Sequence, residues 1–336
     1  MSKARNLSKL LVDSSGDVES GSLDNVPASD DASALTTGTL AVARLPNEGL
    51  SLGSRNYIIN GGFDIWQRGT SVAPVNSWGP DRFFNTNSAM TWTRATNTLG
   101  GPCPYMCTLT GGGSDSRFRF TFELPSSTSQ PPFDVDSYWT LSMYCSLNLA
   151  GRTMGIGYAN SPNDSTDNAS TTGTWVSLGG NRYALTVQIN AVNTNNKLAM
   201  RFSGPFDGPV AEGVGSISVT GVQFEAGSVA TPFEWRPYGQ EFIQCLRYYI
   251  NTNDGSNTVG WTLNTLSGQN YHFPIVFPVA MRAAPSMTYV NWVNNGFAGA
   301  GAFQKTGKFG TNFYSTAAST INGGYLMGSY TASAEL

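Results

Sequence analysis

The sequence predicts an all-β protein with three parts: an extended N-terminal trimerising stalk, a central jelly-roll β-sandwich and, after a short connecting helix, a C-terminal β-sandwich tip. Charged residues make up only 12% of the chain, whereas aromatic residues reach 12% and there are 38 glycines. This composition is typical of a β protein with many turns. From Arg55 onward apolar and polar residues alternate with a period of two, as strands require. Two similar segments, Arg55–Gly69 and Val222–Gly239, enclose a stretch with no helical pattern, and we interpret them as the two ends of one β-domain.

Residues 1–54 form the predicted stalk. Residues 1–50 contain no aromatic residue, and six acids with no intervening base lie between Asp13 and Asp31. Such a segment cannot bury enough apolar surface to fold alone. Leucines and valines are nevertheless spaced along it, and residues 6–12 allow a short helix. We therefore expect this part to be ordered by intertwining with other copies of the chain.

Residues 55–238 form the predicted sandwich. Turn-forming runs of Gly, Pro, Ser and Asn separate short alternating segments, a spacing that favours a β-sandwich or jelly roll. The predicted strands are Phe118–Phe122, Tyr138–Tyr144, Tyr183–Ile189, Leu198–Phe202 and Ile217–Val222.

Residues 239–336 are predicted to begin with the short helix. Phe242, Leu246 and Tyr249 fall on one stripe of that helix. The part that follows is small enough that oligomerisation is expected to complete its core. Its predicted strands are Asn270–Val279, Ser286–Trp292, Lys308–Tyr314 and Gly324–Tyr330.

Charge and hydropathy exclude several classes of protein. The net charge is −3 and no run of Lys or Arg occurs, so a nucleic-acid partner is not expected. No segment approaches the roughly 20 apolar residues of a membrane helix, and the first residues lack the apolar core of a signal peptide. The four cysteines have no metal-site spacing, which favours buried free thiols.

Taken in order, these pieces resemble the tail fibres of tailed bacteriophages. The segment Ser22–Pro46, which contains TTGTLAVARLP, is similar to the shafts of phage fibres. The two enclosing segments are similar to a domain found in phage tail proteins and in some carbohydrate-binding modules. The segment Tyr271–Met287 and the ending YTASAEL resemble distal fibre domains. The resemblance implies a homotrimer on the virion, made in the host cytoplasm, with residues 1–50 docked to a tail or baseplate protein and the C-terminal domain facing host polysaccharide or lipopolysaccharide. No catalytic motif accompanies it, so we expect a binding protein and not an enzyme; a fibre-borne polysaccharide depolymerase and a purely structural fibre are the alternatives.

Tryptophans are the first candidates for sugar binding, because sugar C–H faces stack on flat rings. Trp139 and Trp175 lie in sequence typical of strands and are expected in the core. Trp66 and Trp235 are expected to pack where the ends of the sandwich meet. Trp78 is the best loop candidate, above a predicted Asp81–Arg82 ion pair.

The predicted receptor site lies in the C-terminal domain. Asn295-Gly296 is the strongest hairpin-turn signal in the chain, and an aromatic residue beside amides at a turn suits a surface sugar site. The alternative is an ordinary hairpin whose Trp packs into the trimer core. The candidate residues are Tyr289, Trp292, Asn294, Asn295 and Phe297, with Tyr314 and Tyr325 as second choices.

Three carboxylate pairs and one histidine complete the candidates. The pairs suit two-acid sugar cleavage or a structural calcium ion, the one cofactor left open, but solvated or salt-bridged carboxylates are the favoured interpretation. His272, the only histidine, is expected at a packed or trimer-interface position. The pairs are Asp134 with Asp136, Asp64 with Glu225, and Asp164 with Asp167.

Overall fold

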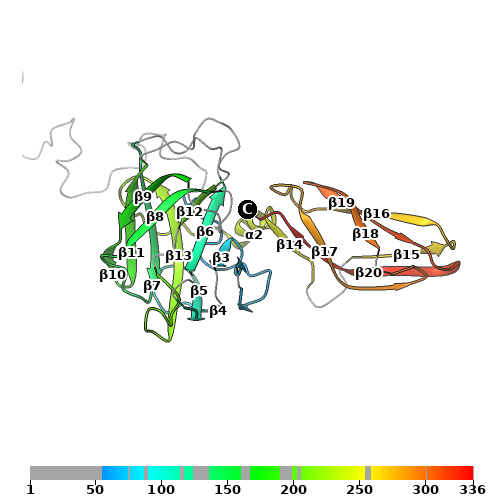
Figure 1. Cartoon of the computed structure of the whole chain (residues 1–336), viewed down its shortest axis with the longest axis horizontal. Helices are drawn as coiled ribbons and strands as arrows, with labels where there is room; N and C mark the ends of the chain where they lie inside the picture. Colours follow the sequence, from blue (N-terminus) through cyan, green and yellow to red (C-terminus); the bar gives the residue numbers. More distant parts are fainter. Residues whose placement is uncertain are drawn as a thin grey trace, which may run out of the picture. The chain divides into compact units, whose positions relative to one another are not determined.

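The computed structural model describes residues 55–335 apart from positions 75, 87–89, 114–116, 124–135, 160–166, 190–198, 203–205, 254–258 and 300. The predicted stalk, residues 1–54, lies outside the described residues. Within them the regular secondary structure is β-strand apart from one short helix, which confirms the all-β prediction (Figure 1).

The first half of the described chain is a jelly-roll-like sandwich of two antiparallel sheets. Its seven-stranded sheet has the order β1 (Ser71–Val72), β4 (Met90–Thr96), β5 (Tyr105–Gly111), β13 (Ser216–Ala226), β7 (Tyr138–Cys145), β11 (Arg182–Gln188) and β10 (Val176–Gly179). Its six-stranded sheet has the order β2 (Ser77–Trp78), β3 (Phe83–Thr86), β6 (Arg117–Glu123), β12 (Ala199–Phe202), β8 (Thr153–Ala159) and β9 (Asp167–Thr174).

The core of this sandwich contains the inward-facing residues of both sheets. Trp139 and Trp175 are both 1% exposed, which confirms their predicted core positions. Trp139 stacks on Phe224, with ring centroids 5.1 Å apart. The five strands predicted here correspond to β6, β7, β11, β12 and β13. Period-2 alternation in the sequence located them, although β13 is buried on both faces.

The two enclosing segments lie together, as the sequence predicted. Tyr57 donates its backbone N–H to Phe224 O at 2.9 Å, and Val222 donates to Gly61 O at 2.9 Å. The Asn56 side chain accepts from Phe224 N at 3.1 Å and donates to Val222 O at 3.0 Å. A Cβ at Gly61 would lie 2.1 Å from Val222 O, so only glycine permits this close approach.

The helix α2 (Tyr238–Leu246) is shorter than predicted. Leu246 is buried and Phe242 packs, partly buried, against the same core, so the predicted stripe is wrong only at Tyr249; Glu241 and Cys245 are the other buried residues of the helix. Tyr249 instead begins the strand β14 (Tyr249–Asn251), whose backbone groups pair with β20. Because pairing with β20 requires an extended backbone, the helix ends before Tyr249. No helix in the described part of the chain is long and apolar enough to cross a bilayer.

The C-terminal half is a second, smaller sandwich with its own core. One sheet pairs β20 (Ile321–Ser333) with β14, β15 (Val259–Thr265) and β17 (Ser286–Asn295). The other has the order β16 (Asn270–Val276), β19 (Gly310–Thr316), β18 (Ala302–Gly307). The four predicted strands correspond to β16, β17, β19 and β20, whereas β14, β15 and β18 were missed. The alternation of Val259, Trp261 and Leu263, which pack against the core, is a signal that would have located β15.

The predicted Asn-Gly hairpin is wrong. β17 ends at Asn295 and pairs with β20, while the next strand, β18, pairs with β19 in the other sheet. Gly296, at φ 87°, therefore turns the chain from one sheet to the other. Phe297 comes next and is buried in the core, and its backbone forms an isolated β-bridge with Ala317. This bridge directs the chain to the second sheet.

All four cysteines are buried free thiols, as predicted. Burial raises the pKa of Cys103 and of Cys145 to about 12, so both are inert apolar residues at neutral pH.

Candidate functional site

Trp292 packs inside the C-terminal sandwich. Its ring stacks on Phe313 with centroids 4.4 Å apart and on Trp261 at 6.0 Å. A Cβ at Gly328 would lie 2.5 Å from Trp292 Cδ2, so the indole lies directly on β20. The indole Nε1 is buried and has no hydrogen-bond partner among the described residues. Trp292 is therefore partly buried within its own chain, and the alternative that it packs into a trimer core stays a prediction.

The other predicted receptor residues do not form one surface with Trp292. Tyr289 is 46% exposed, with its ring 5.9 Å from that of Phe303. Asn294 and Asn295 are exposed at the end of β17, opposite β20. Phe297 is only 5% exposed and contributes to the core. A register shift between Val290 and Val293 in β17 separates Tyr289 from the two asparagines.

Tyr314 belongs to a different surface, on the sheet β16-β19-β18. Its ring stacks on His272, with centroids 5.9 Å apart, and the Asn312 amide nitrogen lies 2.9 Å from His272 Nδ1. Thr316 donates its hydroxyl to Asn270 Oδ1 at 2.6 Å on the same face. We name this surface the outer β19 face; it consists of Asn270, His272, Asn312, Tyr314 and Thr316.

His272 is exposed, so of the two predicted positions, packed or at a trimer interface, the first does not apply and the second stays a prediction. Phe273 and Ile275 take the buried positions of β16, which places the intervening residues outside. The same alternation would have identified the outer β19 face from the sequence.

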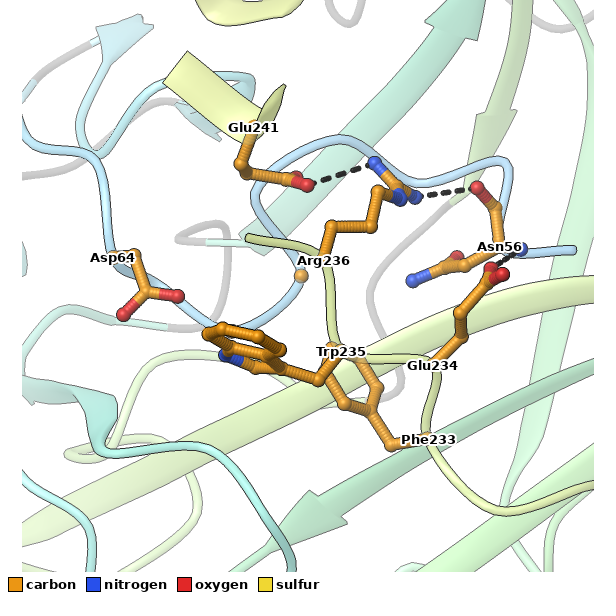
Figure 2. A pocket seen from close by; sticks show the side chains of 9 residues that line it. Asn56, Asp64, Phe233, Glu234, Trp235, Arg236 and Glu241 are labelled. Carbon is orange, nitrogen blue, oxygen red and sulfur yellow. Dashed lines mark hydrogen bonds and ion pairs between the residues drawn. The ribbon is translucent and has the colours of Figure 1, made fainter. Parts of the chain in front are cut away.

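A small pocket opens where the two enclosing segments meet (Figure 2). Trp235 lines it and is 53% exposed, so the prediction that this residue closes the sandwich is wrong. Trp66, by contrast, is buried as predicted and donates Nε1–H to Phe63 O at 2.8 Å. The pocket is lined by Asn56, Gly61, Gly62, Asp64, Phe233, Glu234, Trp235, Arg236 and Glu241.

Arg236 organises the interior side of this pocket. Its guanidinium donates to Glu241 Oε2 at 2.9 Å, to Gln244 Oε1 at 2.9 Å and to the backbone oxygens of Asn56 and Ile58. Burial raises the pKa of Glu241, and the charge of Arg236 opposes that rise. Desolvation also raises the pKa of Asp64, opposed by Arg94.

Of the three predicted carboxylate pairs, only Asp64 with Glu225 lies wholly within the described residues, and neither carboxylate contacts the other there. The Glu225 carboxylate accepts hydrogen bonds from Thr231 N at 2.9 Å, Thr231 Oγ1 at 2.6 Å and Gln223 Nε2 at 2.8 Å. Its partners therefore come from its own strand and the following loop, and Asp64 is not one of them. Asp134 and Asp164 lie outside the described residues, as does the side chain of Asp167. Within the described part of the chain, no three His, Cys, Asp or Glu side chains are grouped so that they could hold a metal ion.

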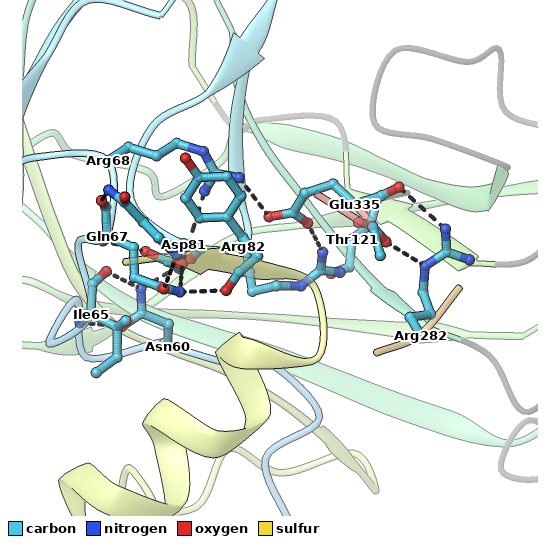
Figure 3. A network of polar contacts seen from close by, with 12 residues as sticks. Asn60, Ile65, Gln67, Arg68, Asp81, Arg82, Thr121, Arg282 and Glu335 are labelled. Carbon is cyan, nitrogen blue, oxygen red and sulfur yellow. Dashed lines mark hydrogen bonds and ion pairs between the residues drawn. The ribbon is translucent and has the colours of Figure 1, made fainter. Parts of the chain in front are cut away.

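Asp81 and Arg82 do form ion pairs, but not with each other (Figure 3). Asp81 accepts from Gln67 N at 2.8 Å and lies 3.9 Å from Arg68. Arg82 pairs with Glu335, which also pairs with Arg68 at 3.2 Å. Trp78 is half-buried, 5.3 Å from the Arg82 guanidinium, so it lies at the edge of this ionic cluster.

Comparison with known proteins places the chain in no family. No protein-family model matches it, and no curated protein matches either. Similar solved structures include the enzymatically active domain of tailspike protein 4 of bacteriophage CBA120, with 13% identity, 52% of this chain and 22% of that chain covered, and a TM-score of 0.31. Two structures of discoidin II of Dictyostelium discoideum, native recombinant and wild-type, have 9% and 10% identity, cover 72% and 83% of this chain and 81% and 91% of theirs, and have TM-scores of 0.18 and 0.17. The chain thus spans about a fifth of the tailspike chain it matches, and likenesses at these TM-scores do not assign a function.

Proposed function

We propose that this chain is a tail-fibre-type virion protein that binds a glycan on the host surface, polysaccharide or lipopolysaccharide, through its C-terminal sandwich. The sequence resemblance to phage fibres along the chain and the all-β architecture support this proposal. The observation that carries the site is the outer β19 face, where the Tyr314 ring, the His272 ring and the Asn312 amide lie together on one sheet surface.

The chemistry of this face suits a sugar. A flat ring offers a stacking plane for sugar C–H groups, while the imidazole and the amides of Asn312 and Asn270 donate and accept hydrogen bonds with hydroxyls. The hydrogen bonds within the face restrict these side chains before a ligand arrives, which lowers the entropy cost of binding.

In this proposal the protein is a homotrimer, with residues 1–50 bound to a tail or baseplate protein. Three weak sugar sites on one particle bind with avidity although each contact alone is weak.

The test is binding of the intact protein to an array of bacterial surface polysaccharides and lipopolysaccharides. We expect the wild type to bind at least one glycan, and Tyr314→Ala and His272→Ala each to weaken that binding about tenfold, since each change removes a ring. Tyr238→Ala, which removes an exposed ring from α2, is the matched control and should bind as the wild type does. Unchanged binding by Tyr314→Ala would contradict the assignment to this face.

The enzyme alternative is tested with the same glycans. Release of reducing ends from a bound polysaccharide would show that the protein is a depolymerase and would contradict the proposal of binding alone. If the intact protein bound no surface glycan and no host cells, the purely structural fibre would be favoured instead.

A further inference from the structure

Trp235 is held at the surface by the two residues beside it. On one side, Glu234 donates its backbone N–H to Gln223 Oε1 at 2.7 Å, and its carboxylate accepts from Asn56 N at 2.7 Å. On the other side, Arg236 is 7% exposed and donates to four acceptors. Because both neighbours are anchored to the interior, the intervening side chain points outward, and the indole is presented to solvent on a rigid frame.

Of the three carboxylates that line the pocket, only that of Asp64 accepts no hydrogen bond from the described residues. The carboxylate of Glu234 is engaged by Asn56, and that of Glu241 by Arg236 and by the backbone N–H of Asn60. The Asp64 carboxylate accepts no hydrogen bond from the described residues, although it is half-buried. Its acceptor capacity is therefore free for a donor in the pocket that it shares with Trp235 (Figure 2).

We propose that the open surface above this small pocket, where Trp235 and Asp64 lie, is a second carbohydrate site, on the central sandwich, that binds one neutral pyranose ring. The indole of Trp235 would stack on the C–H face of the sugar, and Asp64 would accept hydrogen bonds from two adjacent hydroxyls. Gly62 favours this arrangement: a Cβ there would lie 3.2 Å from Asp64 Oδ2, so a larger residue would crowd the carboxylate. An exposed aromatic plane beside a few fixed polar groups is the usual composition of a small-ligand site.

The charges of the pocket disfavour an anionic sugar. Three carboxylates line it, but Arg236 lies directly against Glu241, and Arg94 acts on Asp64. The remaining negative charge is therefore modest. This site lies on a different sandwich from the outer β19 face. The two proposals are therefore independent and are tested separately.

The test is a ligand-observed NMR titration of the intact protein with methyl α-D-glucopyranoside, methyl α-D-galactopyranoside and methyl α-D-mannopyranoside. We expect the wild type to bind at least one of the three. Trp235→Ala should weaken that binding at least tenfold and Asp64→Ala several-fold, whereas Trp235→Phe, which keeps a ring, should retain most of it. Phe309→Ala removes a ring that is 73% exposed and belongs to neither site, so it should titrate as the wild type does.

Three outcomes would overturn the proposal. The wild type could bind none of the three glycosides, Trp235→Ala could bind as tightly as the wild type, or glucosamine could bind at least tenfold more tightly than the glucoside. Tyr314→Ala separates the two sites: it should leave this titration unchanged even if it abolishes binding to the glycan array.

Discussion

Trp235 and Arg236 are adjacent in the sequence and have opposite positions in the structure. Arg236 is drawn inward because four acceptors, two of them backbone oxygens, converge on its guanidinium. No described residue offers an acceptor to the indole of Trp235, which remains 53% exposed. At the scale of single residues, the position of a large side chain near the ends of the sandwich is therefore decided by hydrogen-bond partners far away in the sequence.

Asp81 gives a prediction about pH at the same scale. Burial raises the pKa of this carboxyl to about 6, against the opposing effects of Arg68 and the hydrogen bonds from Gln67. A raised pKa in the folded state means that the protonated carboxyl stabilises the fold below about pH 4, and that this stabilisation is lost as the pH rises through about 6. The full change for this one group is on the order of 3 kcal/mol. Asp81→Asn, which does not titrate, should therefore gain stability relative to the wild type between pH 4.5 and 7.5.

Urea unfolding at several pH values across this range would measure the difference. A free-energy difference between Asp81→Asn and the wild type that does not change with pH would show that the Asp81 pKa is close to its unfolded value. Glu335 and Arg68 are the charged neighbours, and neither is altered in this variant.

At the scale of elements, arginines of the sandwich contact the chain that follows α2. The Arg68 guanidinium lies 3.6 Å from the centroid of the Tyr249 ring, and that of Arg82 lies 3.6 Å from the Tyr248 ring. Both pair with Glu335, which follows β20. The last described residues thus connect the strand β20 to the turn before β3 through a buried ionic cluster.

Glu335→Gln tests the strength of this connection. It leaves the Arg82 guanidinium, 2% exposed, without its anionic partner, and breaking a buried pair in this way typically costs about 3–5 kcal/mol. We expect the free energy of unfolding in urea to fall by about that amount. Glu212→Gln is the control, because it disrupts the more exposed Arg152–Glu212 pair, with an expected loss of about 1 kcal/mol or less. Equal losses in the two variants would contradict the structural role of the cluster.

At the scale of the whole molecule, the described chain has two separate hydrophobic cores. The larger lies between the sheets of the central sandwich and the smaller within the C-terminal sandwich, where Trp261 and Trp292 are only partly buried. Large rings left partly exposed are consistent with further burial by neighbouring chains.

The predicted trimer is tested by light scattering on the intact protein. We expect a particle of three times the chain mass of 35.9 kDa, because the composition of residues 1–50 predicts that they are ordered only by other chains and because the C-terminal core is small. Dissociation at low concentration should also lower the unfolding temperature. A stable monomer would contradict the stalk prediction and, with it, the avidity argument.

The sequence by itself determined the all-β class, five of the thirteen strands of the central sandwich and four of the seven that follow α2, the four buried thiols and the contact between the two enclosing segments. These features depend on local alternation, glycine placement and apolar character, all of which are visible in the printed residues. It did not determine where Trp235, Trp292 or His272 would lie, which partners Asp81 and Arg82 would take, or that Asn295-Gly296 would lead to another sheet. Only the tertiary structure decided these, because each depends on which distant backbone oxygen, carboxylate or aromatic ring the fold brings within contact distance.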